Sequence, residues 1–195
     1  AKVLGYYISI NLDNYEIEEE YMNYVIKRRS LSTMIDKYVI SNTFKEMKML
    51  HDTTRGYILA FISVDKDTIL ESFNSFLETQ RSFYKMSNEY ICFIVADAAM
   101  QQVISIRKEG YKIASTSLID VINGKCDYLL IDYHKIDLDK IDEIKNIANG
   151  HNVSCIFNNI DDKSDLDKAN NYKFDYIYGK YYKKAIRMKN LVEKV

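Results

Sequence analysis

Short runs of apolar residues recur along the whole chain, and longer stretches with helical periodicity separate them. The runs are rich in aromatic and β-branched side chains, as strands buried on both faces of a sheet are. The runs that we expect to form strands are 3–12, 57–64, 90–96, 111–115, 127–132, 153–157 and 174–178.

The clearest unit lies between Gly110 and Asp132 and reads as strand, short helical crossover, strand. A compact apolar run, 111–115, follows the glycine, and a second run, Asp-Tyr-Leu-Leu-Ile-Asp, occupies 127–132. Parallel strands need such a crossover, whereas antiparallel strands can be joined by a tight turn. The spacing therefore predicts two parallel strands.

The stretches between the runs predict helices. Residues 32–50 form an amphipathic helix whose apolar stripe is expected to hold Leu31, Met34, Ile35, Tyr38, Val39, Met47 and Leu50. Further helices are expected at 16–29, after a capping box of Thr68 and Glu71, after Asp97, after Asp137, at 162–171 and from residue 182.

Regular alternation of strands and helices predicts the α/β class with a parallel sheet, in one domain spanning residues 1–195. Seven strands over this length favour a closed or nearly closed barrel, incomplete at its N-terminus. No glycine-rich loop follows the first run, which argues against a dinucleotide-binding fold.

Composition narrows the class further. The net charge is −1, which argues against a general nucleic-acid or membrane-surface binder, and no apolar run reaches the length of a membrane span. No signal-peptide pattern opens the chain. Cys92, Cys126 and Cys155 are unclustered and lie in or beside apolar runs, which is typical of buried reduced thiols. We therefore expect a cytoplasmic location.

Seven segments, in order, resemble the conserved segments of the EAL domain, the family of cyclic-di-GMP phosphodiesterases. They are MIDKYVISNTFKEMK (34–48), YILAFISV (57–64), YICFIVADAAM (90–100), GYKIASTSLI (110–119), CDYLLID (126–132), VSCIFNNID (153–161) and FDYIYGKYY (174–182). The resemblance is clearest over residues 31–182. It implies a modified (β/α)8 TIM-like barrel.

Active members of this family hold two divalent cations, Mg²⁺ or Mn²⁺, with carboxylates and an asparagine at the strand ends, and use a lysine in catalysis. The resemblance places other residue types at those positions. Gly179, in the last segment, keeps the residue of the family pattern. The degenerate positions are Phe61, Ile94, Thr116, Ser117, Leu130, Asn158 and Tyr178.

These substitutions predict a chain without a catalytic site or a bound metal. Hard divalent cations need several charged oxygen ligands, and Phe, Ile and Leu offer none. The surviving acids are Asp97, Asp132 and Asp161. They are interpreted as helix caps and loop ends, and the alternative is a residual site for a single cation.

Other chemistry-bearing residues point to no site. His51, His134 and His151 lack metal-ligand spacing, and no serine stands in a recognisable hydrolase order with a histidine. Residues 178–189 mix tyrosines with lysines and an arginine. We interpret them as a solvated basic helix face, with binding of phosphates or an acidic partner as the alternative.

The hypothesis that results is a catalytically inactive EAL-like domain of a bacterial signalling protein, acting as a regulatory or protein-interaction module. A protein partner or a homodimer is expected. The connection after Ser117 is shorter than in the family, so a dimer should not use that loop as active members do. The alternatives are a non-hydrolysing cyclic-di-GMP sensor and a residual phosphodiesterase; cyclic-di-GMP is not the expected ligand, because the family's first motif has no match.

Overall fold

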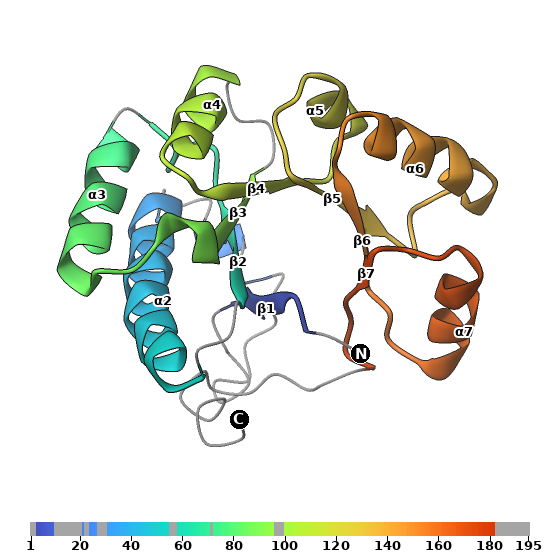
Figure 1. Ribbon diagram of the computed structural model, residues 1–195, viewed down its shortest axis with the longest axis horizontal. Coiled ribbons are helices and arrows are strands. Elements are labelled where there is room, and N and C mark those ends of the chain that lie inside the picture. The colour runs from blue at the N-terminus through green and yellow to red at the C-terminus, as the bar shows by residue number, and fades with distance from the viewer. Residues whose placement is uncertain are drawn as a thin grey trace. The chain divides into compact units, whose positions relative to one another are not determined.

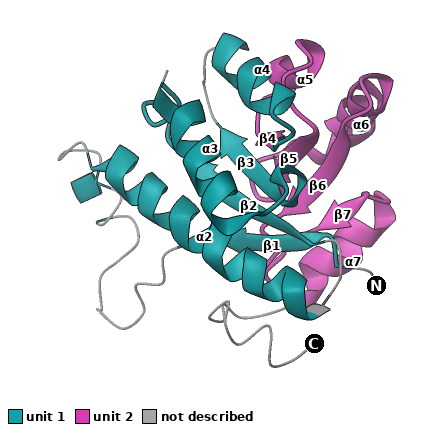
Figure 2. Cartoon of the chain, turned by 60° about the vertical axis from the view of Figure 1, so that its left-hand side comes forward, with its two compact units in different colours: residues 1–112, 187–195 teal, residues 113–186 magenta. Residues whose placement is uncertain are grey.

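The computed structural model describes residues 3–9, 21, 24–26, 31–54, 58–70, 72–95 and 100–181. They fall into two compact units, one ending at Lys112 and the other beginning at Ile113 (Figure 2). The helix expected from residue 182 and the cap expected at Asp97 lie outside the described residues, as does most of the helix expected at 16–29.

The first unit holds three parallel strands that neighbour one another in chain order: β1 (Gly5–Ile8), β2 (Leu59–Val64) and β3 (Ile91–Val95). Helix α2 (Ser32–Thr54) connects the first two strands, and α3 (Ser72–Tyr84) with the short η2 (Asn88–Tyr90) connects the next two. Helix α4 (Met100–Lys108) follows β3. Figure 1 shows α2 and α3 along one side of these strands.

The second unit repeats the pattern with four parallel strands, again in chain order: β4 (Lys112–Ser115), β5 (Tyr128–Asp132), β6 (Ser154–Asn158) and β7 (Tyr176–Ile177). The connections are α5 (Leu118–Ile122), then η3 (Leu138–Lys140) with α6 (Ile141–Gly150), then α7 (Lys163–Asn171). The carboxylates of Asp137 and Asp162 accept hydrogen bonds from the first turns of η3 and α7, which confirms both expected helix starts.

The described chain is therefore α/β with parallel strands joined by helices, as the hydrophobic pattern predicts. All seven expected strands are present among the described residues. Where both ends are described, β4 and β5 are one residue shorter than expected, β7 is three residues shorter, and β6 is shifted by one residue. None of the described helices combines the length and hydrophobicity that crossing a bilayer requires.

Helix α2 buries only part of the expected stripe, since Met47 and Leu50 are fully buried but other members of the stripe are not. Ile40, Phe44 and Met47 have no exposed surface, whereas Met34 is 63% exposed and Tyr38 is 67% exposed. Residues 34 and 38 lie on one helical face and 40, 44 and 47 on another, and both faces carry apolar residues. Burial of the second face makes the assignment of Met34 and Tyr38 to the buried stripe wrong.

Thr68 does not cap α3. Its hydroxyl donates to the Asp36 carboxylate of α2 at 2.6 Å, and the side chain is 2% exposed. The helix itself begins four residues later, at Ser72. The capping-box pattern was therefore wrong about the role of Thr68, whose buried hydroxyl binds Asp36 instead of the start of α3.

Candidate functional site

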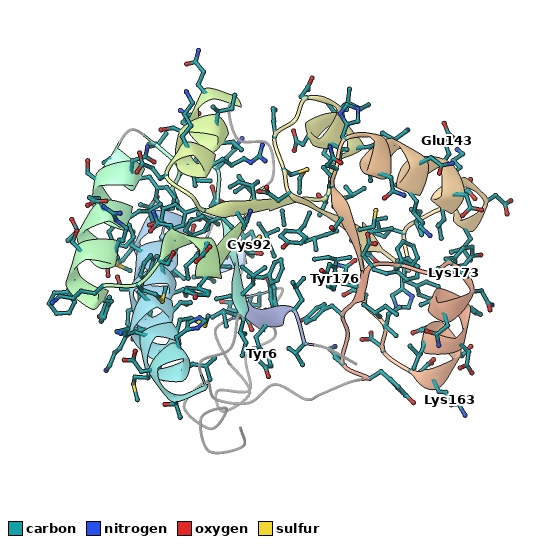
Figure 3. The ribbon with its side chains drawn as sticks, in the orientation of Figure 1. Tyr6, Cys92, Glu143, Lys163, Lys173 and Tyr176 are labelled. Atoms are coloured by element: carbon teal, nitrogen blue, oxygen red, sulfur yellow. The ribbon has the colours of Figure 1, made fainter. Side chains whose placement is uncertain are left out.

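The two faces of the strands in the first unit have different neighbours. The Phe93 ring lies 5.6 Å from the Phe73 ring of α3, so Phe93 and the alternating residues beside it face the helices. Phe61, which pairs in register with Cys92, therefore faces away from the helices, as does Ile94. Cys92 is labelled in Figure 3.

Ile94 lies near the carboxyl end of β3, where parallel α/β folds carry their sites, whereas Phe61 is the third of the six residues of β2 and lies before the middle of that strand. Phe61 is 7% exposed and Ile94 is half-buried. Beside them the Tyr7 hydroxyl lies 3.0 Å from the Ser63 hydroxyl, joining β1 to β2 on the same face. Tyr7 and Ser63 were not among the expected site residues. The register of β1 on β2, which pairs Tyr7 with Phe61, places them on this face, and the sequence alone does not give that register.

The second unit has the same arrangement. Phe157 stacks on Phe174 at 4.1 Å, and the Lys145 ammonium of α6 lies over that second ring, so Phe157 faces the helices. Leu130 and Asn158 therefore lie on the opposite face of β5 and β6.

The end of this face carries one acid and one amide in register. Asp132, the last residue of β5, pairs with Asn158, the last residue of β6. The Asn158 Oδ1 atom is buried and has no hydrogen-bond partner among the described residues. A buried acceptor without a partner is unfavourable, so this oxygen is the clearest unsatisfied polar group at the strand ends.

Asp132 is already engaged in hydrogen bonds. Its carboxylate accepts the backbone N–H of His134 at 3.0 Å and lies 3.3 Å from the Lys135 ammonium. Partial burial opposes ionisation, but hydrogen bonds from Asn159, His134 and Lys135 outweigh it and hold the pKa of Asp132 below its ordinary value. Asp132 is thus a stable carboxylate that caps the turn after β5.

Thr116 and Ser117 follow β4 directly, and a local network fixes this turn. The Ser115 hydroxyl donates to Asp120 at 2.7 Å and accepts the Ser117 backbone N–H at 3.0 Å. Lys125 lies 3.1 Å from the Asp120 carboxylate, which neutralises it. Asp120, the acid nearest to Thr116 and Ser117 in the chain, therefore stabilises this turn through its hydrogen bond and ion pair.

Tyr178 follows β7 and is 45% exposed, and its backbone N–H donates to the Phe157 carbonyl at 2.8 Å. Gly179, next to it, lies so close to Ile160 that a Cβ atom would overlap the Ile160 backbone. The retained glycine thus has a packing reason.

These residues do not fit a pair of divalent cations. Apolar side chains stand at three of the seven positions, and the remaining four are neutral. No three His, Cys, Asp or Glu side chains within the described part of the chain lie close enough together to hold a metal ion. Phe61 and Leu130 lie in the middle of β2 and β5, so their expected place at the carboxyl ends of these strands is wrong. The other five positions lie at or close to the carboxyl ends of strands: Ile94, Thr116, Ser117, Asn158 and Tyr178. The convergence of all seven on one mouth stays a prediction.

Comparison with solved structures shows which known proteins share this fold. No protein-family model and no curated protein sequence matches the chain. Among solved structures, the EAL enzyme Bd1971 in its cGMP-bound form is similar, with a TM-score of 0.81 and 13% identity over 94% of this chain and 57% of that one.

Two further solved structures are also similar in fold to this chain. The PaMucR phosphodiesterase in complex with c-di-GMP has a TM-score of 0.77 at 11% identity, covering 90% of this chain and 81% of that one. The Bacillus subtilis YkuI protein, which has an EAL domain and was solved with c-di-GMP and calcium, has a TM-score of 0.63 at 18% identity, covering 98% and 56%.

The chain therefore has the fold of EAL domains, the modified TIM-like barrel that the order of its segments predicted. It spans little more than half the length of the Bd1971 chain. The identity is low enough that the likeness establishes the fold alone.

Proposed function

We propose that this chain is a non-catalytic EAL-fold module of a signalling protein, which acts by contacting protein rather than by hydrolysing cyclic-di-GMP. The observation that carries the proposal is the chemistry of the strand ends. By the resemblance of the segments, Phe61, Ile94 and Leu130 stand at the strand positions from which active EAL domains hold metal or assist catalysis.

Electrostatics supports the absence of catalysis. Two divalent cations bring four positive charges, which several carboxylates must balance. Asp132 is the one acid at the end of its strand face, and its oxygens already accept from the turn behind it. A site of this kind would not concentrate metal or orient a phosphodiester for attack.

The corresponding strand face of each unit, taken by itself, is better suited to protein contact. Tyr7 is 40% exposed and Tyr178 is 45% exposed, and each lies near the end of its strand. Tyrosine combines a large apolar ring with a hydroxyl, and it is enriched at protein interfaces. A partner or a second copy could cover these rings without any charged ligand.

A hydrolysis assay tests the catalytic half of the proposal. The chain is incubated with cyclic-di-GMP and Mn²⁺ beside an active EAL phosphodiesterase, and linear product is followed by chromatography. We expect product from the active enzyme alone. Turnover by this chain would refute the proposal.

A size and capture measurement tests the binding half. Light scattering of the purified chain, and recovery of bound protein from cells of its source, should reveal a dimer or a specific partner. A strict monomer that recovers no partner would count against the proposal.

A cyclic-di-GMP sensor is the second candidate, and the similarity to domains solved with that ligand favours it. Titration calorimetry with cyclic-di-GMP separates the two, because a sensor gives heat without linear product. A residual phosphodiesterase would need metal, and the unpartnered Asn158 Oδ1 beside Asp132 is where a cation would bind. Anomalous scattering from Mn²⁺-soaked crystals should show no peak there.

A further inference from the structure

A pocket of about 730 Å³ lies wholly within the first unit, at the amino ends of strands rather than at their carboxyl ends. The end of α3, the η2 turn before β3 and the turn from α4 into β4 form its walls. The residues used below are Arg81, Lys85, Asn88, Glu89, Glu109 and Lys112. None of them belongs to the positions considered so far.

The pocket wall contains a buried acceptor with nothing to accept from. Asn88 is 7% exposed, and its amide nitrogen donates to the Glu109 carbonyl, which fixes the side chain in one orientation. The Asn88 Oδ1 atom has no hydrogen-bond partner in the described part of the chain. The atom itself has almost no accessible surface, so the N–H or ammonium group of a ligand would satisfy it after the side chains that cover it shift.

Two helices direct their carboxyl ends to the same place. Helix α3 ends at Tyr84, and Lys85 after it has a φ of 51°; helix α4 ends at Lys108, and Gly110 has a φ of 97°. The last carbonyls of a helix carry partial negative charge, which favours a positive group nearby. The Glu89 and Glu109 side chains add full negative charges to the lining.

The lining also carries positive charge. Arg81 is neutralised by Glu78 at 2.6 Å, but Lys112, the first residue of β4, is half-buried and lines the pocket with Lys85. Charges of both signs in one small pocket match a molecule that carries both signs itself. They do not match cyclic-di-GMP, which carries two phosphates and lacks a positive charge.

We propose that this pocket binds a small zwitterion of the free amino-acid class. Its ammonium group lies toward Asn88 Oδ1 and the two glutamates, and its carboxylate lies toward Lys112 and Lys85. The site would give the module a ligand input at the ends of the strands opposite to those of the EAL active site. It does not depend on the proposed function, because it uses none of the same residues.

Amide chemical shifts of the full ¹⁵N-labelled chain test this site. The probes are the common L-amino acids, pooled by side-chain charge, with ethylamine, acetate and cyclic-di-GMP as single-sign comparisons. We expect at least one amino acid to shift amides within residues 81–89 and 109–112, and the single-sign probes to leave them unchanged at equal concentration. Equal shifts with ethylamine or acetate would contradict a zwitterion site.

Variants separate binding from folding. Lys112→Gln and Glu89→Gln each remove one charge and keep the size of the side chain, and each should weaken binding by about tenfold, as charge-assisted contacts do. Lys135→Gln is the matched control, since Lys135 lies in the second unit and its side chain is 83% exposed. Unchanged affinity in both pocket variants would overturn the proposal.

Two further outcomes would also overturn it. No shift with any amino acid up to millimolar concentrations would mean that the pocket is not a site for this class. Shifts with a lysine-rich peptide but with no free amino acid would mean that the pocket receives a partner's side chain instead. The results of the hydrolysis assay and of the partner-binding measurement would leave this test unaffected.

Discussion

Single residues in this chain fasten one element to another, and Asp36 is the clearest case. Its Oδ2 atom accepts from the Thr68 hydroxyl at 2.6 Å and from the Asp65 backbone N–H at 2.8 Å, which ties α2 to the turn after β2. Burial raises the pKa of Asp36 above its ordinary value, although both hydrogen bonds act in the other direction.

This shift predicts a pH dependence of stability with a definite sign. Because the folded chain binds the Asp36 proton more tightly than the unfolded chain does, this group adds stability as the pH falls through its folded pKa. Asp36→Asn keeps an oxygen acceptor and removes the desolvated charge. The variant should be as stable as the parent or more so at about pH 7, and that advantage should shrink toward about pH 4.5.

Urea unfolding at several pH values measures this difference. Asp67→Asn is the matched control, because Asp67 lies in the same turn and is exposed. If the difference in free energy of unfolding between Asp36→Asn and the parent does not change with pH, Asp36 has the same pKa in the folded and the unfolded chain, and the prediction is wrong.

Gly179 keeps the glycine of the family's last segment, and its packing against Ile160 explains why a glycine is needed there. A Cβ atom at position 179 would overlap the backbone of Ile160, whose N–H donates to the Tyr178 carbonyl and whose own carbonyl accepts from Tyr181. Gly179→Ala should lower the free energy of unfolding by about 1–3 kcal/mol, the usual cost of forced overpacking.

Gly150→Ala is the comparison for this prediction. Nothing lies within 4 Å of a Cβ at Gly150, which ends α6. Alanine there should be neutral or stabilising by up to about 1 kcal/mol, because it reduces the entropy of the unfolded chain. Thermal unfolding of both variants checks the pair, and equal stability of the two would contradict the packing argument.

At the scale of elements, the sequence predicted strands better than helix faces. An apolar run that must be buried on both sides of a parallel sheet leaves no choice of face, so 128–132 and 154–158 were found almost to the residue. Helix α2 carries apolar residues on two adjacent faces, and propensity cannot decide which one is buried. In the folded chain, packing against the rest of the unit buries the face with Phe44 and leaves the face with Tyr38 exposed.

The proposed amino-acid pocket is invisible to the hydrophobic pattern for a related reason. Its walls come from helix ends and turns, where polar residues are ordinary and carry no periodic signal. What distinguishes Asn88 is a buried oxygen without a partner, and that property exists only once the chain is folded.

Helix α7 depends on a side chain of the helix before it. The Lys145 ammonium donates to the carbonyls of Tyr172 and Lys173 just after α7 ends, and it lies 5.3 Å from the centre of the Phe174 ring. Lys145→Met keeps the aliphatic stem and removes these bonds. The variant should lose about 1–2 kcal/mol of stability, because two carbonyls lose a charged donor.

Hydrogen exchange measured along 163–177 should show the loss directly, as faster exchange at the end of α7. Lys140→Met is the control: that side chain is 66% exposed and pairs with Asp137 at 3.6 Å, so its removal should change stability by less than about 0.5 kcal/mol. If both variants behave alike, Lys145 does not secure the end of α7.

At the scale of the whole molecule, fold and site differ in how well the sequence predicts them. The fold is shared with EAL structures at 11–18% identity, with TM-scores from 0.63 to 0.81 among the three structures compared. Many apolar residues can fill the same place in a sheet, so the fold survives extensive substitution. A ligand position depends on one side chain, so the likeness in fold leaves untested the expectation that Phe61 and Leu130 replace metal-binding or catalytic residues of active EAL domains.

The cysteines offer a test of whether residues 1–195 form the single domain that the sequence predicts. Cys92 lies in the first unit and Cys155 in the second, and both are essentially inaccessible. Burial, with the nearby Asp175 charge, raises the pKa of Cys155 to about 11. Thiolate is the reactive form, so this group should be inert in the folded chain at about pH 8 and reactive once exposed, since a free cysteine has a pKa of about 8.5.

Thiol labelling in increasing sub-denaturing urea, read by mass spectrometry of separate peptides, then reports the opening of each unit. One cooperative domain predicts the same urea dependence for Cys92 and Cys155, because both become accessible only by global unfolding. Labelling of the fully denatured chain supplies the intrinsic rates for comparison. A smaller urea dependence at one cysteine would mean that its unit opens alone, and the prediction of a single domain would be wrong.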